Sequence, residues 1–149
     1  MLTIRDFKQS DKKDFCAMAE TFYNSDVVCS KIPQENINKT FDLCIAKSPY
    51  ARGLIFDYNG EAAGFALISF THSTEAGGLV VLIEEVFVKE NFRGKGILRE
   101  FFAMLDKEYG DLAKRYKLEV TKSNLKAIDI YKHYGFKVVE YLAMVKDKL

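Results

Sequence analysis

The stretch that decides the fold reads Leu82-Ile83-Glu84-Glu85-Val86-Phe87-Val88, then Lys89-Glu90-Asn91-Phe92-Arg93-Gly94-Lys95-Gly96, then Ile97-Leu98-Arg99-Glu100-Phe101-Phe102-Ala103-Met104-Leu105. Its first part is rich in apolar residues and predicts a strand, and its last part predicts a helix. The glycines between them predict a turn. A strand that turns and restarts as a helix presents free backbone N–H groups and the positive end of a helix dipole. That arrangement is typical of a phosphate-binding site.

Two named phosphate-binding motifs do not match this turn. The dinucleotide pattern requires a third glycine where Arg99 stands, and the Walker loop requires Lys and then Ser or Thr where Ile97 and Leu98 stand. An alternative stays open, in which the glycines serve only a tight turn.

Composition and charge limit the class of protein. The chain has 149 residues, of which 48% are hydrophobic and 29% charged, which predicts one soluble domain over residues 1–149. A net charge of +1 does not favour nucleic acid or an anionic membrane as a partner. No apolar run approaches the ~20 residues of a membrane span, and no signal peptide opens the chain. Three scattered cysteines, Cys16, Cys29 and Cys44, indicate reduced thiols in the cytoplasm.

The rest of the chain predicts alternating strands and helices. Ser10 or Asp11 is expected to cap the first helix, Pro33 to open the second, and Asn59-Gly60 to form a hairpin turn. The expected elements are a strand at 2–7, helices around 15–23 and 37–45, strands at 54–58 and 63–68, a polar connection at 71–78, a strand at 117–120, a helix from Leu125 that Gly135 stops, and a strand at 136–145. This order predicts a mixed α/β fold with a twisted, mostly antiparallel central sheet flanked by helices.

Two segments carry a family resemblance. Arg93-Gly94-Lys95-Gly96-Ile97, following Glu84 to Val88, resembles the acetyl-CoA-binding segment of the GNAT N-acetyltransferase superfamily, although Leu98 replaces its usual Gly or Ala. Asn124-Leu125-Lys126-Ala127-Ile128-Asp129-Ile130-Tyr131-Lys132-His133-Tyr134-Gly135-Phe136 resembles the family's C-terminal pattern Asn-x-x-Ala-x-x-x-Tyr-x-x-x-Gly-Phe. Together with the element order, the resemblance spans nearly the whole chain.

The resemblance implies a binding site for acetyl-CoA as co-substrate, without a metal, where two neighbouring strands splay apart. Asn124 and the ring of Tyr131 are expected beside the pantetheine arm. Leu98 either crowds the pyrophosphate or, as we favour, turns inward with its helix face. The other expected contacts are the backbone of Phe87 and Val88, for the arm, and the N–H groups of Arg93, Gly94, Lys95, Gly96, Ile97 and Leu98, for the pyrophosphate.

Acetyl transfer to an amine assigns three tasks to this chain. An ammonium of pKa about 10 must lose a proton, the thioester oxygen must be stabilised, and the thiolate must be protonated. We expect the N–H of Val88 and the phenol of Tyr131 to perform the second and third tasks. Glu84 and Glu85 are the candidates for the first. Consecutive residues of a regular strand point to opposite faces, and we favour Glu84, although a β-bulge would reverse this assignment.

The sequence therefore predicts an acetyl-CoA-dependent N-acetyltransferase that acts on a primary amine by direct attack in a ternary complex. The expected acceptor is a small molecule, such as a polyamine, an aminoglycoside or an amino-acid-like amine, contacted by the polar segments 24–33 and 71–78. The alternatives are a protein lysine or N-terminal acetyltransferase and a non-catalytic acyl-CoA sensor. A homodimer is left open.

Overall fold

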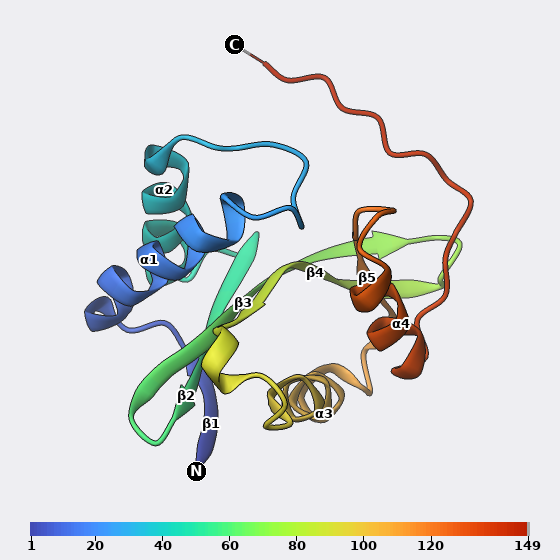
Figure 1. Cartoon of the computed structure of the whole chain (residues 1–149). Helices are drawn as coiled ribbons and strands as arrows, with labels where there is room; N and C mark the ends of the chain where they lie inside the picture. Colours follow the sequence, from blue (N-terminus) through green and yellow to red (C-terminus); the bar gives the residue numbers. More distant parts are fainter. Residues whose placement is uncertain (149) are drawn as a thin grey trace. The chain divides into compact units, whose positions relative to one another are not determined.

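The computed structural model describes residues 1–148 and divides into two compact units, Met1–Glu119 and Val120–Leu149, which are described separately (Figure 1). The first unit contains the sheet, whose strands lie in the order β1-β2-β3-β4-β5. These strands are β1 (Leu2–Asp6), β2 (Ala51–Tyr58), β3 (Glu61–Ser73), β4 (Gly78–Val88) and β5 (Ala113–Leu118). The pairs β1–β2, β2–β3 and β3–β4 are antiparallel and the pair β4–β5 is parallel, so the predicted mostly antiparallel sheet is confirmed.

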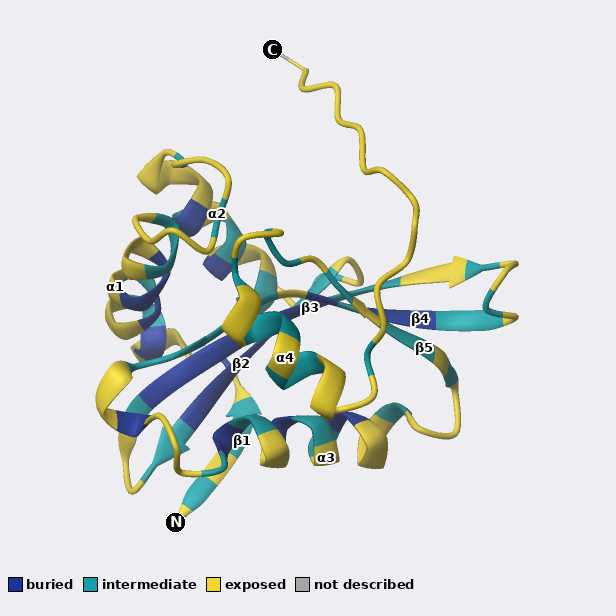
Figure 2. Cartoon of the chain, turned by 45° about the vertical axis from the view of Figure 1, so that its right-hand side comes forward, coloured by how far each residue is buried: buried dark blue, intermediate teal, exposed yellow. Residues whose placement is uncertain are grey.

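Helices cover both faces of this sheet, because successive strand residues point to opposite sides. Helices α1 (Lys12–Tyr23) and α2 (Gln34–Ile45) pack on one face, where the buried rings of Phe15 and Phe41 join Phe65 of β3 in one core cluster. Helix α3 (Ile97–Tyr109) packs on the other face, where the Phe101 ring lies 5.4 Å from that of Phe56 in β2. Figure 2 shows the central strands as the most buried part of this unit.

The hairpin turn lies where the sequence predicts it, whereas the ends of two strands differ from the predicted bounds. Asn59 and Gly60 adopt the positive φ angles of 53° and 87° that a two-residue hairpin requires. Strand β3 extends to Ser73, so the predicted polar connection at 71–78 shrinks to residues 74–77. Strand β5 ends at Leu118, earlier than the predicted strand at 117–120.

The second unit holds α4 (Leu125–His133), which ends before Gly135 at a φ of 93°, as predicted for a left-handed stop. The predicted strand over 136–145 is wrong, because residues 136–148 form neither helix nor strand. A strand needs a neighbour for its backbone N–H and C=O groups, and within residues 1–148 the sheet ends at β5. Among the same residues, no helix is long and apolar enough to cross a membrane.

Candidate functional site

The turn between β4 and α3 is held by its own residues. The short 3-10 helix η2 (Glu90–Phe92) places Phe92 against the sheet, where it is buried with its ring 5.7 Å from that of Tyr58. The N–H of Lys89 donates to the carbonyl of Ala63 at 2.8 Å. These contacts fix the point at which the exposed residues 93–95 leave the sheet.

Two glycines let the chain enter α3 without a side-chain cap. Gly94 and Gly96 have φ angles of 76° and 78°, a region that L side chains rarely adopt. Gly96 is the N-cap of α3, and the first intrahelical bond runs from the N–H of Glu100 to its carbonyl at 3.1 Å. The N–H groups of the first helical turn therefore have no acceptor within the helix.

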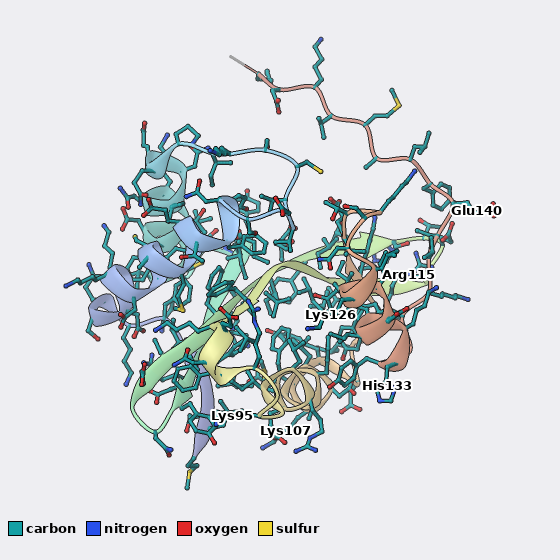
Figure 3. All side chains as sticks on the ribbon, viewed as in Figure 1. Lys95, Lys107, Arg115, Lys126, His133 and Glu140 are labelled. Carbon is teal, nitrogen blue, oxygen red and sulfur yellow. The ribbon has the colours of Figure 1, made fainter. Side chains whose placement is uncertain are left out.

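Side chains of three kinds surround this helix start, among them the Arg99 guanidinium, which lies beside the N-cap Gly96. Ile97 is buried and Leu98 is half-buried, so Leu98 does not lie fully exposed over the turn. Figure 3 labels Lys95 in the turn before α3, and its Nζ lies 5.7 Å from the centroid of the Tyr58 ring. The predicted residues Arg93 to Leu98 thus form one continuous turn that carries the positive charges of Arg93 and Lys95 into the start of α3.

Strand β4 has an open edge immediately before this turn. Its pairing with β5 ends at Ile83 and Leu118, while β4 continues to Val88. Because Lys89 donates toward β3 and strand residues alternate, the N–H and C=O of Val88 face the open edge. The Val88 carbonyl accepts a bond from Nε of Arg93 at 3.0 Å, and the Val88 N–H remains directed to the same edge.

Phe87 is placed differently from its neighbour. It pairs with Phe65 of β3, and its carbonyl lies so close to Gly64 that a Cβ added there would come within 2.2 Å of it. The backbone of Phe87 therefore faces β3, and the expected contact between this backbone and a pantetheine arm does not fit the geometry. Its ring packs against the Phe65 ring at 6.1 Å.

A β-bulge changes the arrangement of the two glutamates. Leu67 of β3 pairs with Glu85, whereas Ile68 pairs with Ile83, so Glu84 is an inserted residue. The Ser69 hydroxyl donates to Glu84 Oε1 at 2.5 Å, and Ser69 shares the face of Leu67 because the two are separated by one residue. The expectation that Glu84 and Glu85 point to opposite faces is wrong, since both lie on the face of α1 and α2.

The two carboxylates lie in different surroundings on that face. Glu84 is exposed, whereas Glu85 is only partly accessible and has Tyr23 of α1 among its neighbours. Burial raises the pKa of Glu85 to about 7, the nearby Tyr23 hydroxyl opposes this rise, and the charge of Glu84 adds to it. Glu85 therefore changes its protonation state near neutral pH.

The remaining predicted site residues belong to the second unit. The Asn124 side-chain oxygen accepts a bond from the N–H of Ala127 at 3.2 Å and caps α4, so the amide NH₂ is the group left for a ligand. The Tyr131 ring packs edge-on against Phe136 at 5.9 Å. Burial raises the pKa of the Tyr131 phenol, which therefore holds its proton at neutral pH.

Two residues near the glutamates, Tyr23 and Ser69, were not among the predicted site residues. Tyr23 belongs to the apolar stripe of α1, so its hydroxyl gave no signal of its own. Ser69 is a polar residue inside the buried run of β3, and that position was the available signal. Within residues 1–148, no three His, Cys, Asp or Glu side chains are grouped in a way that would hold a metal ion.

Comparison with known proteins gives one family match. Residues 16–136 match the model of the acetyltransferase (GNAT) family. No curated protein matches the chain in sequence.

Solved structures share the fold at low sequence identity. A possible acetyltransferase from Clostridium difficile 630 matches with a TM-score of 0.84 and 14% identity, covering 100% of this chain and 99% of that one. The aminoglycoside N-acetyltransferase AAC(6')-Iy, solved with a bisubstrate analogue, matches with a TM-score of 0.80 and 16% identity, covering 100% and 99%. A ribosomal-protein-alanine N-acetyltransferase from Brucella melitensis biovar Abortus 2308 matches with a TM-score of 0.72 and 15% identity, covering 99% and 100%.

Proposed function

This chain belongs to the GNAT acetyltransferase family, and we propose that it moves the acetyl group of acetyl-CoA to a primary amine of a small, cationic molecule. The observation that carries the proposal is that three features of the expected site follow one another closely along the chain. The open edge at Val88, the uncapped start of α3 and the partly buried Glu85 all lie on β4 or directly after it.

Acetyl-CoA supplies a thioester with a thiolate leaving group, and the residues of this turn fit it. The N–H groups at Gly96, Ile97 and Leu98, with the positive end of the α3 dipole, suit a pyrophosphate. Glycine at 94 and 96 provides the backbone conformation that exposes these groups. The N–H of Val88 suits the thioester oxygen, because a fixed backbone donor stabilises the charge that develops there.

Glu85 is the group we assign to proton removal, in place of Glu84. A carboxylate with a pKa near 7 is about half ionised at neutral pH and is a stronger base than an ordinary glutamate. It faces the side of the sheet that carries α1 and α2, and we place the amine there. Tyr131, whose phenol keeps its proton at neutral pH, is assigned to protonate the thiolate.

The small cationic acceptor is supported by charge. The exposed Glu84 beside Glu85 gives this face a negative potential, which attracts an ammonium group. A protein amine is the second candidate acceptor, since one protein of the same fold is a ribosomal-protein-alanine N-acetyltransferase. A non-catalytic sensor is disfavoured, because binding an acyl-CoA requires no base of raised pKa.

The proposal is tested by measuring thiol release from acetyl-CoA with a panel of polyamines, aminoglycosides and amino acids, beside lysine peptides and peptides with free N-termini. We expect release that depends on a small amine. Release with peptides alone would transfer the activity to protein amines, and tight acetyl-CoA binding without release to any amine would favour the sensor.

A further inference from the structure

We propose that Ser69 is a positioning residue for this reaction, and that it fixes Glu84 as the carboxylate that selects acceptors with a second positive charge. The inference rests on the proposed function, in which Glu85 takes the proton of the reacting amine. Ser69 lies on β3 and Glu84 on β4, and the Ser69 hydroxyl donates to Glu84 Oε1 at 2.5 Å. The bond therefore joins two neighbouring strands on the face where we place the amine.

Ser69 stands where this face of β3 changes from buried to accessible. Phe65 and Leu67, which share its face because strand side chains alternate, are 0% and 8% exposed, whereas Ser69 is half-buried. The serine side chain has a single rotatable bond before its oxygen, so the hydroxyl stays close to the strand. A donor with so little freedom determines where its partner carboxylate lies.

The bulge in β4 brings Glu84 to this donor. Residues 67 and 68 of β3 pair with Glu85 and Ile83, respectively. Glu84 is therefore the inserted residue and turns toward the face of Ser69. An exposed glutamate side chain otherwise samples several rotamers, and ordering it costs free energy when a ligand binds. The bond from Ser69 restricts this motion beforehand, which favours binding.

The same geometry leaves one oxygen of Glu84 for a ligand. The bond from Ser69 is to Oε1, and within the described residues 1–148 no hydrogen bond or ion pair involves Oε2. The exposed position of Glu84 lets a cation reach this oxygen from solvent. A carboxylate held at one oxygen and open at the other suits an ammonium group, since hydrogen bonds between ionised partners are the strong ones.

Glu84 and Glu85 cannot both serve the reacting nitrogen. The attacking amine must lose its proton to Glu85, whereas the charge of Glu84 favours the protonated ammonium. Glu84 therefore suits a second cationic group of the acceptor. Neighbouring residues have Cα atoms ~3.8 Å apart, and these two side chains share a face. The two nitrogens of the acceptor should therefore be a few bonds apart, as in a short diamine.

The first test compares kcat/KM, per amino group, for putrescine and for butylamine, which differ by one charged group. The wild-type protein should prefer the diamine about ten- to a hundredfold, the range of a charged hydrogen bond. Glu84→Gln keeps an oxygen for Ser69 but removes the charge, so this preference should disappear. Ser69→Ala keeps the charge but frees the side chain, so the preference should fall about three- to tenfold, through KM for the diamine.

Further variants separate positioning from packing. Ser69→Thr keeps the hydroxyl on a residue that strands favour, so it should restore the preference. Thr3→Val removes an exposed hydroxyl from β1 and should leave the preference unchanged. In a double-mutant cycle, Ser69→Ala should have no further effect on the preference once Glu84→Gln is present. A serine with a merely structural role would lower kcat/KM equally for both amines in either background.

Transfer without a preference for the diamine, or an unchanged preference in Ser69→Ala, would overturn the inference while the proposed function stands. Absence of transfer to any amine would instead refute the proposed function. Calorimetric titration with putrescine then decides the inference. Weaker binding in both Glu84→Gln and Ser69→Ala would retain Ser69 as the residue that positions a cation-binding carboxylate, and equal binding in both variants and the wild type would reject it.

Discussion

At the scale of single residues, the surroundings that suit Glu85 to its proposed role in proton removal also lower the stability of the folded protein. Its surroundings raise its pKa from 4.5 to about 7, so the folded protein binds this proton more tightly than the unfolded chain does. Below about pH 4.5 both states are protonated and burial costs little. As the pH rises through about 7 the folded state must ionise a partly buried group, and stability is lost.

Glu85→Gln should therefore remove a pH-dependent loss of stability. The wild-type free energy of unfolding should fall relative to that of the variant by about 1–3 kcal/mol as the pH rises from about 4.5 to about 7. Urea unfolding of both proteins at several pH values measures this difference. Glu61→Gln, at an exposed glutamate, is the control and should show no such trend. A constant difference between wild type and Glu85→Gln would contradict the raised pKa.

Tyr131→Phe tests the other proton transfer. Because the change keeps the ring that packs against Phe136, acetyl-CoA affinity should persist while turnover falls about 10²-fold. Steady-state kinetics and calorimetry separate the two effects. Equal turnover in the variant would reduce Tyr131 to a packing residue, and a matching loss of affinity would assign its hydroxyl to binding.

At the scale of elements, β4 carries both the open edge and the bulge. The turn after it was predictable, because Gly94 and Gly96 signal their backbone conformation locally. The face of the sheet to which Glu84 and Glu85 point could not be predicted. Alternation of side chains assumes a regular strand, and the bulge arises from the pairing of β4 with β3. The proximity of Tyr23 to Glu85 depends on packing between distant segments, which no local pattern encodes.

Gly64→Ala should disturb this edge from the β3 side. An added Cβ would lie 2.2 Å from the Phe87 carbonyl, so β4 must move next to Val88. We expect a loss of about 1–3 kcal/mol in stability, as for other overpacked sites, and weaker acetyl-CoA binding. Denaturant unfolding and calorimetry check both.

Gly78→Ala is the matched control for that change. Gly78 lies at the start of β4, the strand that Gly64→Ala would push, but a Cβ at Gly78 meets only the side chain of Lys114, which is exposed and can move aside. Both stability and acetyl-CoA affinity should stay near wild type. An equal loss in the two variants would show that the close approach at Phe87 has no special effect on the edge.

At the scale of the whole molecule, the core and the C-terminal segment differ sharply. Phe101 is fully buried, whereas Val138, Leu142 and Met144 are 74%, 82% and 92% exposed. The apolar pattern of 136–145 predicted a strand because such patterns mark buried strands, but a pattern does not provide the neighbour that a strand needs. The order of the other elements could be predicted because local patterns, such as the apolar stripes of α1 and α2 and the glycine turns, mark where each begins and ends.

Phe101→Ala and Met144→Ala should therefore have very different effects. Removing a buried ring should cost about 3–5 kcal/mol, whereas truncating an exposed methionine should cost less than about 0.5 kcal/mol. Thermal or urea unfolding measures both changes. A large loss in Met144→Ala would show that the C-terminal segment is packed in solution.

The most direct test of the central claim, that the edge of β4 and the start of α3 hold acetyl-CoA, is titration calorimetry with acetyl-CoA in buffer containing a metal chelator. We predict saturable binding of one acetyl-CoA per chain, weakened in Gly96→Val, since valine at this left-handed N-cap distorts the turn. Absence of binding by folded wild-type protein, or unchanged affinity in folded Gly96→Val, would contradict it.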